Sequence, residues 1–168
     1  MIIVLTVAAA FLLQTSVFAM LPVSITTPNL LLIVTVGFSL LLGNRKGLFI
    51  GLLSGLLCDI FFGSLIGFYA LLYAVIGYAA GKLQHFMYVE DVKFPSLVIA
   101  VSDFIFGFLT YVFLFLIQNR LIFSYYCINI ILPEMIFTVI CTLPVYPLLL
   151  WLYHKYLREI RESEKNFV

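Results

Sequence analysis

The chain has 168 residues, of which 64% are hydrophobic and 10% are charged, with a formal net charge of +1 and a mean hydropathy of +1.19. A soluble domain is typically about 45–50% apolar and about 25% charged, and a small domain leaves much of its surface in water. The composition therefore excludes an ordinary soluble domain and predicts an integral membrane protein, while the small net charge gives no indication of a nucleic-acid partner.

Six apolar stretches follow one another along the chain, and a helix of about 20 apolar residues crosses a bilayer. The predicted spans are residues 2–21, 29–42, 47–62, 65–83, 94–118 and 128–153. The first stretch has neither a preceding basic segment nor a clear cleavage signal, so we expect a retained helix and not a signal peptide. We predict an all-α integral membrane protein with one six-helix domain over residues 1–154. A charged tail, residues 155–168, is expected to extend the last helix.

The basic residues predict the orientation of these spans. Of the nine lysines and arginines, all but Arg120 fall on one side of the six-span arrangement: Arg45, Lys46, Lys82, Lys93, Lys155, Arg158, Arg161 and Lys165. Because cytoplasmic loops of membrane proteins are enriched in lysine and arginine, both termini are predicted to be cytoplasmic. Arg45, Lys46, Lys82 and Arg158 are the expected positive anchors at that surface.

Small residues recur at every fourth position through the centre of the sequence. Glycine or aspartate occupies positions Gly47, Gly51, Gly55, Asp59, Gly63 and Gly67, and the spacing returns at Gly77 and Gly81. Small residues four positions apart let two membrane helices approach closely. Two roles remain open for this stripe: packing inside the protein's own bundle, or contact with the transmembrane helix of a partner or of a second copy.

Three carboxylates lie within the predicted spans: Asp59, Asp103 and Glu134. A charge at the centre of a bilayer costs at least about 2.5–3.5 kcal/mol, so such residues usually face the bundle interior. Asp103 is predicted to be the deepest, whereas Asp59 and Glu134 lie near the outer ends of their spans, where hydrogen bonds at the interface cost less. Apart from Lys82 at the cytoplasmic end of the fourth span, no lysine, arginine or histidine lies within a span. The acids therefore need backbone partners, a proton, or hydroxyl partners such as Tyr69, Tyr73, Tyr78 or Tyr111.

For Asp59 we predict backbone hydrogen bonds that close the hairpin between the third and fourth spans. An asparagine could still accept such a bond, so the sequence predicts a mild effect of Asp59→Asn. A proton or cation relay through the intramembrane acids is the alternative.

The sequence does not indicate an enzyme, a cofactor or a metal site. It contains no phosphate-binding loop, no HExxH and no GxSxG motif. Its three cysteines, Cys58, Cys127 and Cys141, form no CxxC pair, and we expect them to be apolar packing residues.

Several segments together resemble the MreD family of bacterial rod-shape membrane proteins. They are Pro28–Leu32, Gly43–Gly47, Gly55–Gly63, Gly67–Leu71, Ile76–Leu83, Ala100–Phe104 and Leu132–Glu134, followed by Pro144 and the basic tail. The resemblance extends over the whole chain. The family pattern often has Pro-Asp where this chain has Pro28-Asn29.

The resemblance implies a non-enzymatic organiser in the bacterial cytoplasmic membrane. Such proteins act with MreC, a single-span protein with an external domain. Together they link cytoplasmic MreB filaments to the RodA glycosyltransferase and its penicillin-binding transpeptidase, which build the lateral wall. On this hypothesis the glycine stripe binds MreC, and replacing Gly51 and Gly55 with leucine should abolish co-purification of MreC.

The resemblance also implies a fold similar to the six-helix substrate-binding subunits of energy-coupling-factor vitamin transporters. Such a subunit is therefore the alternative function. Two features disfavour it: the docking motif of small residues is missing after Ala8–Ala10, and Gly63-Ser64 leaves little room for a substrate-binding loop.

Overall fold

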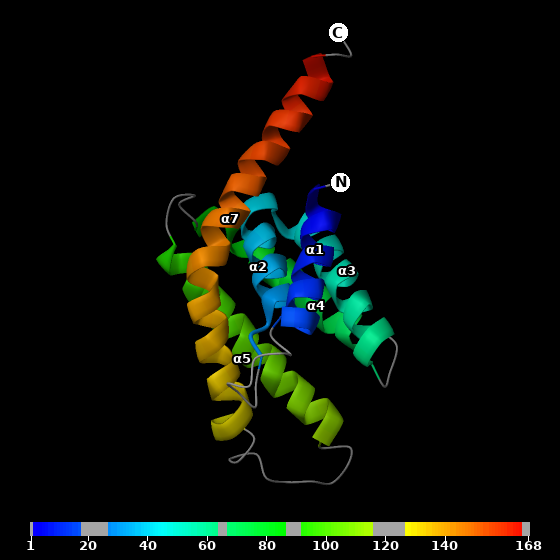
Figure 1. Ribbon diagram of the computed structural model, residues 1–168, viewed down its shortest axis with the longest axis vertical. Coiled ribbons are helices and arrows are strands. Elements are labelled where there is room, and N and C mark those ends of the chain that lie inside the picture. The colour runs from blue at the N-terminus through cyan, green and yellow to red at the C-terminus, as the bar shows by residue number, and fades with distance from the viewer. Residues whose placement is uncertain (1, 18–26, 64–66, 87–91, 116–126, 166–168) are drawn as a thin grey trace.

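The protein is helical throughout the residues that the computed structural model describes, which are 2–17, 27–63, 67–86, 92–115 and 127–165 (Figure 1). The α-helices are α1 (Ile2–Leu12), α2 (Leu30–Leu42), α3 (Asn44–Phe62), α4 (Phe68–Lys82), α5 (Lys93–Phe115) and α7 (Leu132–Lys165). A π-helical turn η1 (Leu13–Val17) continues α1, a 3₁₀ turn η3 (Leu83–Phe86) follows α4, and a second π-helical turn η4 (Cys127–Ile131) precedes α7. The predicted all-α class is confirmed.

Glycines with positive φ precede both α3 and α4. Gly43, with φ of 89°, ends α2 at the predicted residue and donates its N–H to the Ser39 carbonyl, and α3 begins at the next residue. Arg45 and Lys46 were expected between two spans, but they lie in the first turn of α3. Gly67, in the left-handed region with φ of 99°, directly precedes α4, and residues 65 and 66 of the predicted fourth span lie outside the described residues. Glycine adopts this backbone conformation without the penalty that a Cβ brings.

The other ends of the predicted spans are settled only in part. α7 runs without a break from Leu132 to Lys165, so the expected boundary at residue 154 is not an interruption of the helix. Residues 18–21 of the first predicted span and 116–118 of the fifth lie outside the described residues. The side chain of Arg158 also lies outside them, although its backbone belongs to α7.

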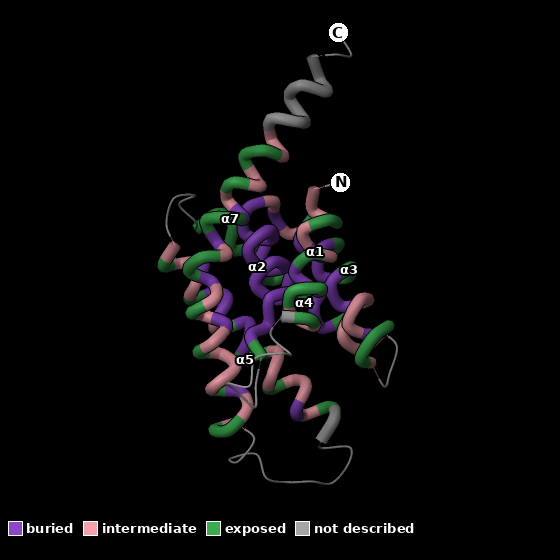
Figure 2. The backbone as a smooth tube through the Cα atoms, in the orientation of Figure 1, coloured by how far each residue is buried: buried purple, intermediate pink, exposed green. Residues whose placement is uncertain are grey.

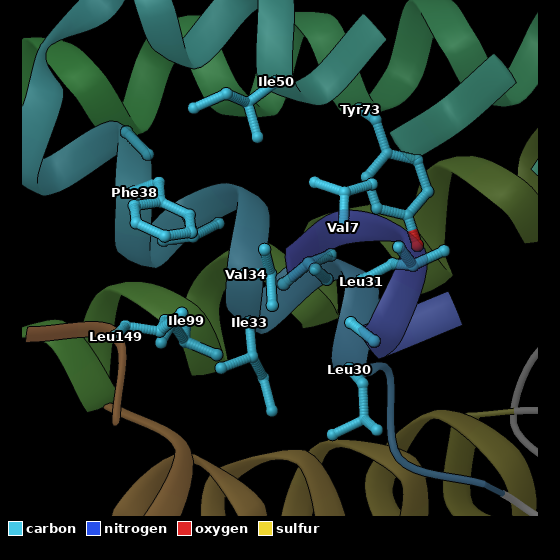
Figure 3. Packing of buried hydrophobic residues seen from close by; sticks show 14 of the residues in the cluster. Val7, Leu30, Leu31, Ile33, Val34, Phe38, Ile50, Tyr73, Ile99 and Leu149 are labelled. Atoms are coloured by element: carbon cyan, nitrogen blue, oxygen red, sulfur yellow. The ribbon is translucent and has the colours of Figure 1, made fainter. Parts of the chain in front are cut away.

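α2 forms the centre of the bundle. Every residue from Leu30 to Leu41 is buried, and α1, α3, α4, α5 and α7 all contact this helix. Figure 2 shows it as a continuous purple tube enclosed by helices whose outer faces are pink and green. Its side chains pack against Val7, Tyr73 and Leu149 from three other helices (Figure 3). A helix that is apolar on every face needs such a complete enclosure.

The surrounding helices expose large apolar side chains, including Phe49, Ile60, Leu97 and Trp151. Lys93–Phe113 and Cys127–Leu157 are long and apolar enough to cross a membrane, and less than a third of each apolar window is buried (28% and 22%). An apolar surface this extensive marks a site of membrane or protein contact. Ile2–Ser16 and Leu30–Leu42 are apolar but shorter.

Successive α-helices run in alternating directions, so the two termini point toward the same end of the bundle (Figure 1). At this end Lys46 Nζ lies 5.4 Å from the centre of the Tyr156 ring, and Gln84 Nε2 donates a hydrogen bond of 3.1 Å to the Leu41 carbonyl. We call it the basic end, because the described cations that it holds are Arg45, Lys46, Lys82, Lys93 and Lys155.

α3 and α4 share the most extensive contact in the described bundle, and glycines make it possible. Gly51 faces the Tyr73 backbone and Gly55 faces the backbone of Tyr69 and Ala70. A Cβ at Gly51 would lie closer to the Tyr73 carbonyl than any ordinary Cβ contact. We call this contact the glycine seam; its glycines are Gly47, Gly51 and Gly55 on α3 with Gly77 and Gly81 on α4.

Replacing Gly51 with alanine should therefore force α3 and α4 apart. We expect a loss of stability of about 1–3 kcal/mol or more, because the obstacle is backbone and cannot change rotamer. Thermal unfolding of the purified protein in one detergent measures it. Gly107→Ala is the matched control: its Cβ would meet the Ile131 side chain at 3.2 Å, where a small adjustment suffices. Equal stability losses in the two variants would contradict the glycine seam as a constraint.

Candidate functional site

Asn29 organises the start of the enclosed helix α2. Its Oδ1 accepts hydrogen bonds from the backbone N–H of Leu32 (3.2 Å) and from the hydroxyl of Tyr73 on α4 (2.7 Å). Its own N–H donates to Thr138 Oγ1 on α7 (3.2 Å). In Figure 3 Tyr73 reaches across from α4 with its hydroxyl directed toward the first turns of α2. One cap residue thus joins α2, α4 and α7.

The remaining N–H groups of this first turn also find partners within the protein. The N–H of Leu31 donates to Gln14 Oε1 from η1 at 3.1 Å, and the N–H of Leu30 donates to the Pro28 carbonyl at 3.1 Å. Ile33 makes the first bond to the Asn29 carbonyl, at 3.2 Å. The first turn of a helix otherwise leaves N–H groups unsatisfied, and in a membrane interior each of them is costly.

Two carboxylates border the same place. Asp103 on α5 is 3% exposed, and the side chains of Thr138 and Asn29 lie within hydrogen-bonding reach of its carboxylate. Asp103 Oδ1 nevertheless has no hydrogen-bond partner among the described residues. Glu134 lies one helical turn before Thr138 on α7, close enough to Asp103 for their charges to interact. We call Asn29, Tyr73, Asp103, Glu134 and Thr138 the polar cluster.

Asp59 lies elsewhere, at the junction of α3 and α4. Its Oδ2 accepts from the N–H of Gly67 (3.0 Å) and Ala70 (2.9 Å), and its Oδ1 accepts from the N–H of Tyr69 (3.0 Å). The predicted backbone hydrogen bonds of Asp59 are thus confirmed. The residue lies one turn before the end of α3, as predicted, and the protein covers it almost completely, since it is only 2% exposed. The N-terminus of α4 favours a negative charge there through its free N–H groups and its dipole.

The glycines predicted from the sequence serve two structural purposes. Those of the glycine seam pack α3 against α4, which is the first of the two roles that the sequence left open. Gly63 and Gly67 do not continue the helical stripe, since they end α3 and precede α4. The hypothesis that the stripe is a surface for a partner helix is therefore corrected, because α4 covers it.

The outer side of the α3–α4 pair carries an open apolar groove of about 400 Å³. Leu48 and Leu52 line it from α3, and Leu71 and Val75 from α4. Its remaining lining residues are Gly67, Ala70, Ala74 and Tyr78. Three of these four are small, and a Cβ at Gly67 would meet nothing within 4 Å. We call this feature the outer groove.

The chemistry available to the polar cluster is hydrogen bonding and the burial of charge. It contains carboxyl, hydroxyl and amide groups but neither a histidine nor a thiol, so it does not pair a nucleophile with an imidazole base. Over the described part of the chain, no three histidine, cysteine or acidic side chains are grouped to hold a metal ion.

Sequence reasoning missed two members of the polar cluster, Asn29 and Thr138. Tyr73 was expected as one of several hydroxyl partners for the acids, whereas its hydroxyl donates to Asn29. Pro28-Asn29 directly before an apolar run is a typical helix-start signal and could have identified the cap. Nothing local predicts that Tyr73 and Thr138, 44 and 109 residues away, complete it.

The family model described as "rod shape-determining protein MreD" matches residues 1–156 of the chain. The match includes all five glycines of the glycine seam and the whole polar cluster. No curated protein and no solved structure matches the chain.

Asparagine at position 59 should be more harmful than the sequence suggested. The asparagine side chain has one acceptor oxygen and one NH₂ group in place of the two carboxylate oxygens. At least one of the three backbone N–H donors would therefore face the NH₂ group, which cannot accept a hydrogen bond. Leaving a buried donor unsatisfied costs about 1–3 kcal/mol, and we expect Asp59→Asn to lose that much stability.

Ser54→Ala is the control for this measurement, which is again thermal unfolding in detergent. Ser54 is also fully buried on α3, but it takes part in a single neutral hydrogen bond, accepted from Thr35 Oγ1 at 3.0 Å. A smaller stability loss in Asp59→Asn than in Ser54→Ala would contradict the capping role of the carboxylate.

Proposed function

Since the chain belongs to the MreD family of rod shape-determining proteins, we propose that it is a multi-pass scaffold of the bacterial cytoplasmic membrane. In this role it holds MreC and, through MreC or directly, couples MreB to RodA and its penicillin-binding transpeptidase. The family establishes a role in rod-shape determination and is not a family of enzymes. The scaffold mechanism and its partners are our proposal.

The arrangement of the helices supports a six-span topology with both termini in the cytoplasm. Two helices have the length and composition of membrane spans, and the others enclose or flank α2 in alternating directions. The described lysines and Arg45 gather at the basic end, which the positive-inside tendency assigns to the cytoplasm. α7 extends beyond the other helices there (Figure 1), where it could reach a cytoplasmic partner.

The outer groove is the observation that carries the proposed contact with MreC. Between Gly67 and Tyr78 it follows α4 for about 17 Å at 1.5 Å per residue, roughly three helical turns. Small residues in the groove allow another helix to approach α4 closely. Because lipid is as apolar as the helices, the hydrophobic effect does not drive their association, and close packing of matching shapes must supply the affinity. We infer that the single transmembrane helix of MreC lies in this groove.

The vitamin-transporter alternative is not proposed, because the family match supports shape determination. The expected likeness to transporter substrate-binding subunits remains a prediction from the resemblance. The Gly51 and Gly55 double leucine variant is no longer a suitable test of MreC binding. Those side chains would strike the α4 backbone and disrupt the fold itself.

A better test fills the groove and leaves every glycine of the seam unchanged. Ala74→Phe places a ring in the outer groove, and we expect it to weaken MreC co-purification by about tenfold, which corresponds to ~1.4 kcal/mol. Cells that depend on this variant should lose their rod shape. Val101→Phe is the matched control, since Val101 is an outward apolar residue of α5 that is 52% exposed.

Both variants should enter the membrane in equal amounts and unfold at similar temperatures. Retention of MreC by the Ala74→Phe protein, or equal loss in both variants, would contradict the proposed docking site. If Ala74→Phe instead abolished self-association and left MreC bound, a second copy of the chain would be the occupant of the groove.

A further inference from the structure

α7 contains two prolines in its interior, Pro144 and Pro147. Proline has no backbone N–H, so the carbonyls of Ile140 and Leu143, four residues earlier, lose their usual helical hydrogen bonds, and each ring crowds the preceding turn. In the membrane-spanning arrangement proposed above, no water replaces the missing donors. This part of α7 therefore resists bending less than an uninterrupted helix does.

α7 bends in its middle part. In Figure 1 its yellow part and its orange and red part point in different directions. Bends in helices are usually caused by proline, and threonine hydroxyls that bond to the carbonyl four residues earlier favour them too. α7 has two such threonines before its prolines. Thr138 Oγ1 donates to the Glu134 carbonyl at 2.8 Å, and Thr142 Oγ1 donates to the Thr138 carbonyl at 2.7 Å.

The bend directs the end of α7 over the basic end of the bundle. Pro144 and Pro147 are exposed, whereas Thr142 and Leu149 are buried, so the prolines lie on the outer face of the helix. Because a proline ring clashes with the turn before it, the helix opens on the side of the proline and closes on the opposite side. Here the opposite side is the one that faces the bundle.

Two contacts hold the segment after the prolines in this position. Leu149 packs where Gly37 of α2 has no side chain, since a Cβ at Gly37 would lie 2.6 Å from Leu149 Cδ1. The ring of Tyr156 lies 5.4 Å from Lys46 Nζ on α3. Neither contact is strong. Lipid is as apolar as leucine, so Leu149 would lose packing but no hydrophobic burial on leaving α2, and a cation–π contact of an exposed lysine is weak.

We propose that Pro144 and Pro147 form a hinge, about which residues 148–165 of α7 move between two positions. The docked position is the one described above. In the undocked position α7 is straighter, and Leu149 and Tyr156 have left α2 and α3.

The part of α7 before the hinge stays in place. Thr138 accepts a hydrogen bond of 3.2 Å from the N–H of Asn29, which fixes this part to the start of α2. The segment that the proposed topology places in the cytoplasm can therefore move without disturbing the polar cluster. The hinge does not depend on MreC docking, because no residue of α7 lines the outer groove.

Pulsed electron double resonance between two spin labels tests the hinge in the full-length protein in lipid nanodiscs, with the native cysteines replaced by alanine. One label replaces Phe49, which is 66% exposed on α3, and the other replaces His154, which is exposed beyond the hinge. We expect two distance populations for this pair. The reference pair, Phe49 with Ile136 before the hinge, should give one population.

Replacing both Pro144 and Pro147 with alanine restores the two helical hydrogen bonds. We expect this variant to show a single population for the Phe49–His154 pair. Pro133→Ala is the matched control, because this proline lies near the start of α7, outside the hinge, and both populations should remain.

The contact of Lys46 with Tyr156 provides a second test. Lys46→Gln should raise the ratio of undocked to docked protein about two- to fivefold, the effect of losing an exposed cation–π contact. Lys155→Gln is its control. Lys155 Nζ lies 5.6 Å from the centre of the Trp151 ring within the same segment, so this contact moves with the segment and its loss should leave the ratio unchanged.

A single population for the Phe49–His154 pair in both the wild type and Lys46→Gln would overturn the hinge. Persistence of two populations in the double alanine variant would also overturn it. Two populations for the Phe49–Ile136 pair would show that α7 moves as a whole and would contradict a hinge at the prolines. Equal shifts in Lys46→Gln and Lys155→Gln would contradict the docked contact.

Discussion

The complete enclosure of α2 is the constraint on which the rest of this structure depends. A helix in contact with protein on every side has neither water nor lipid headgroups at its ends, so its terminal N–H and C=O groups need protein partners. Gln14, Asn29 and Thr138 supply them at one end, and Gln84 bonds to the Leu41 carbonyl at the other. The polar cluster is thus a consequence of a buried apolar helix, because the polar atoms must converge where that helix begins.

Asp59 and Asp103 show that burial alone does not determine how a carboxylate is hydrogen-bonded. Both are almost fully buried aspartates in apolar helices, with 2% and 3% of their surface exposed. The first lies where a new helix begins and its N–H groups point at the carboxylate. The second lies in the middle of α5, where backbone donors are used within the helix. Position along a helix therefore determines how many backbone donors a buried carboxylate can find.

Sequence periodicity predicted much of the fold but little of the polar cluster. Apolar runs and their breaks identified α2 almost to the residue, and the Gly47–Gly51–Gly55 spacing identified a surface for close packing. The spacing could not predict which helix would cover that surface. A helix of a partner protein could pack against these glycines as well as α4 does with Gly77 and Gly81. Asn29, Tyr73 and Thr138 meet only through the tertiary fold, and a single polar residue in an apolar run has no period to reveal it. The early start of α3 at Asn44 was missed, because one glycine with positive φ at position 43 suffices to separate two helices.

Different kinds of contact hold the two sides of the bundle together, and this difference suits a scaffold. α3 and α4 meet backbone to backbone at Gly51 and Gly55, so their separation does not depend on side-chain rotamers. The outer groove that they form is therefore a fixed shape, and a fixed shape is what one helix can recognise in another when hydrophobicity provides no preference over lipid. α5 and α7 meet around Asp103, Glu134 and Thr138, so hydrogen bonds of side chains, and not backbone contact, characterise that side of the bundle. None of the residues that line the outer groove belongs to the polar cluster, so a helix bound in the groove would leave the hydrogen bonds at the start of α2 in place.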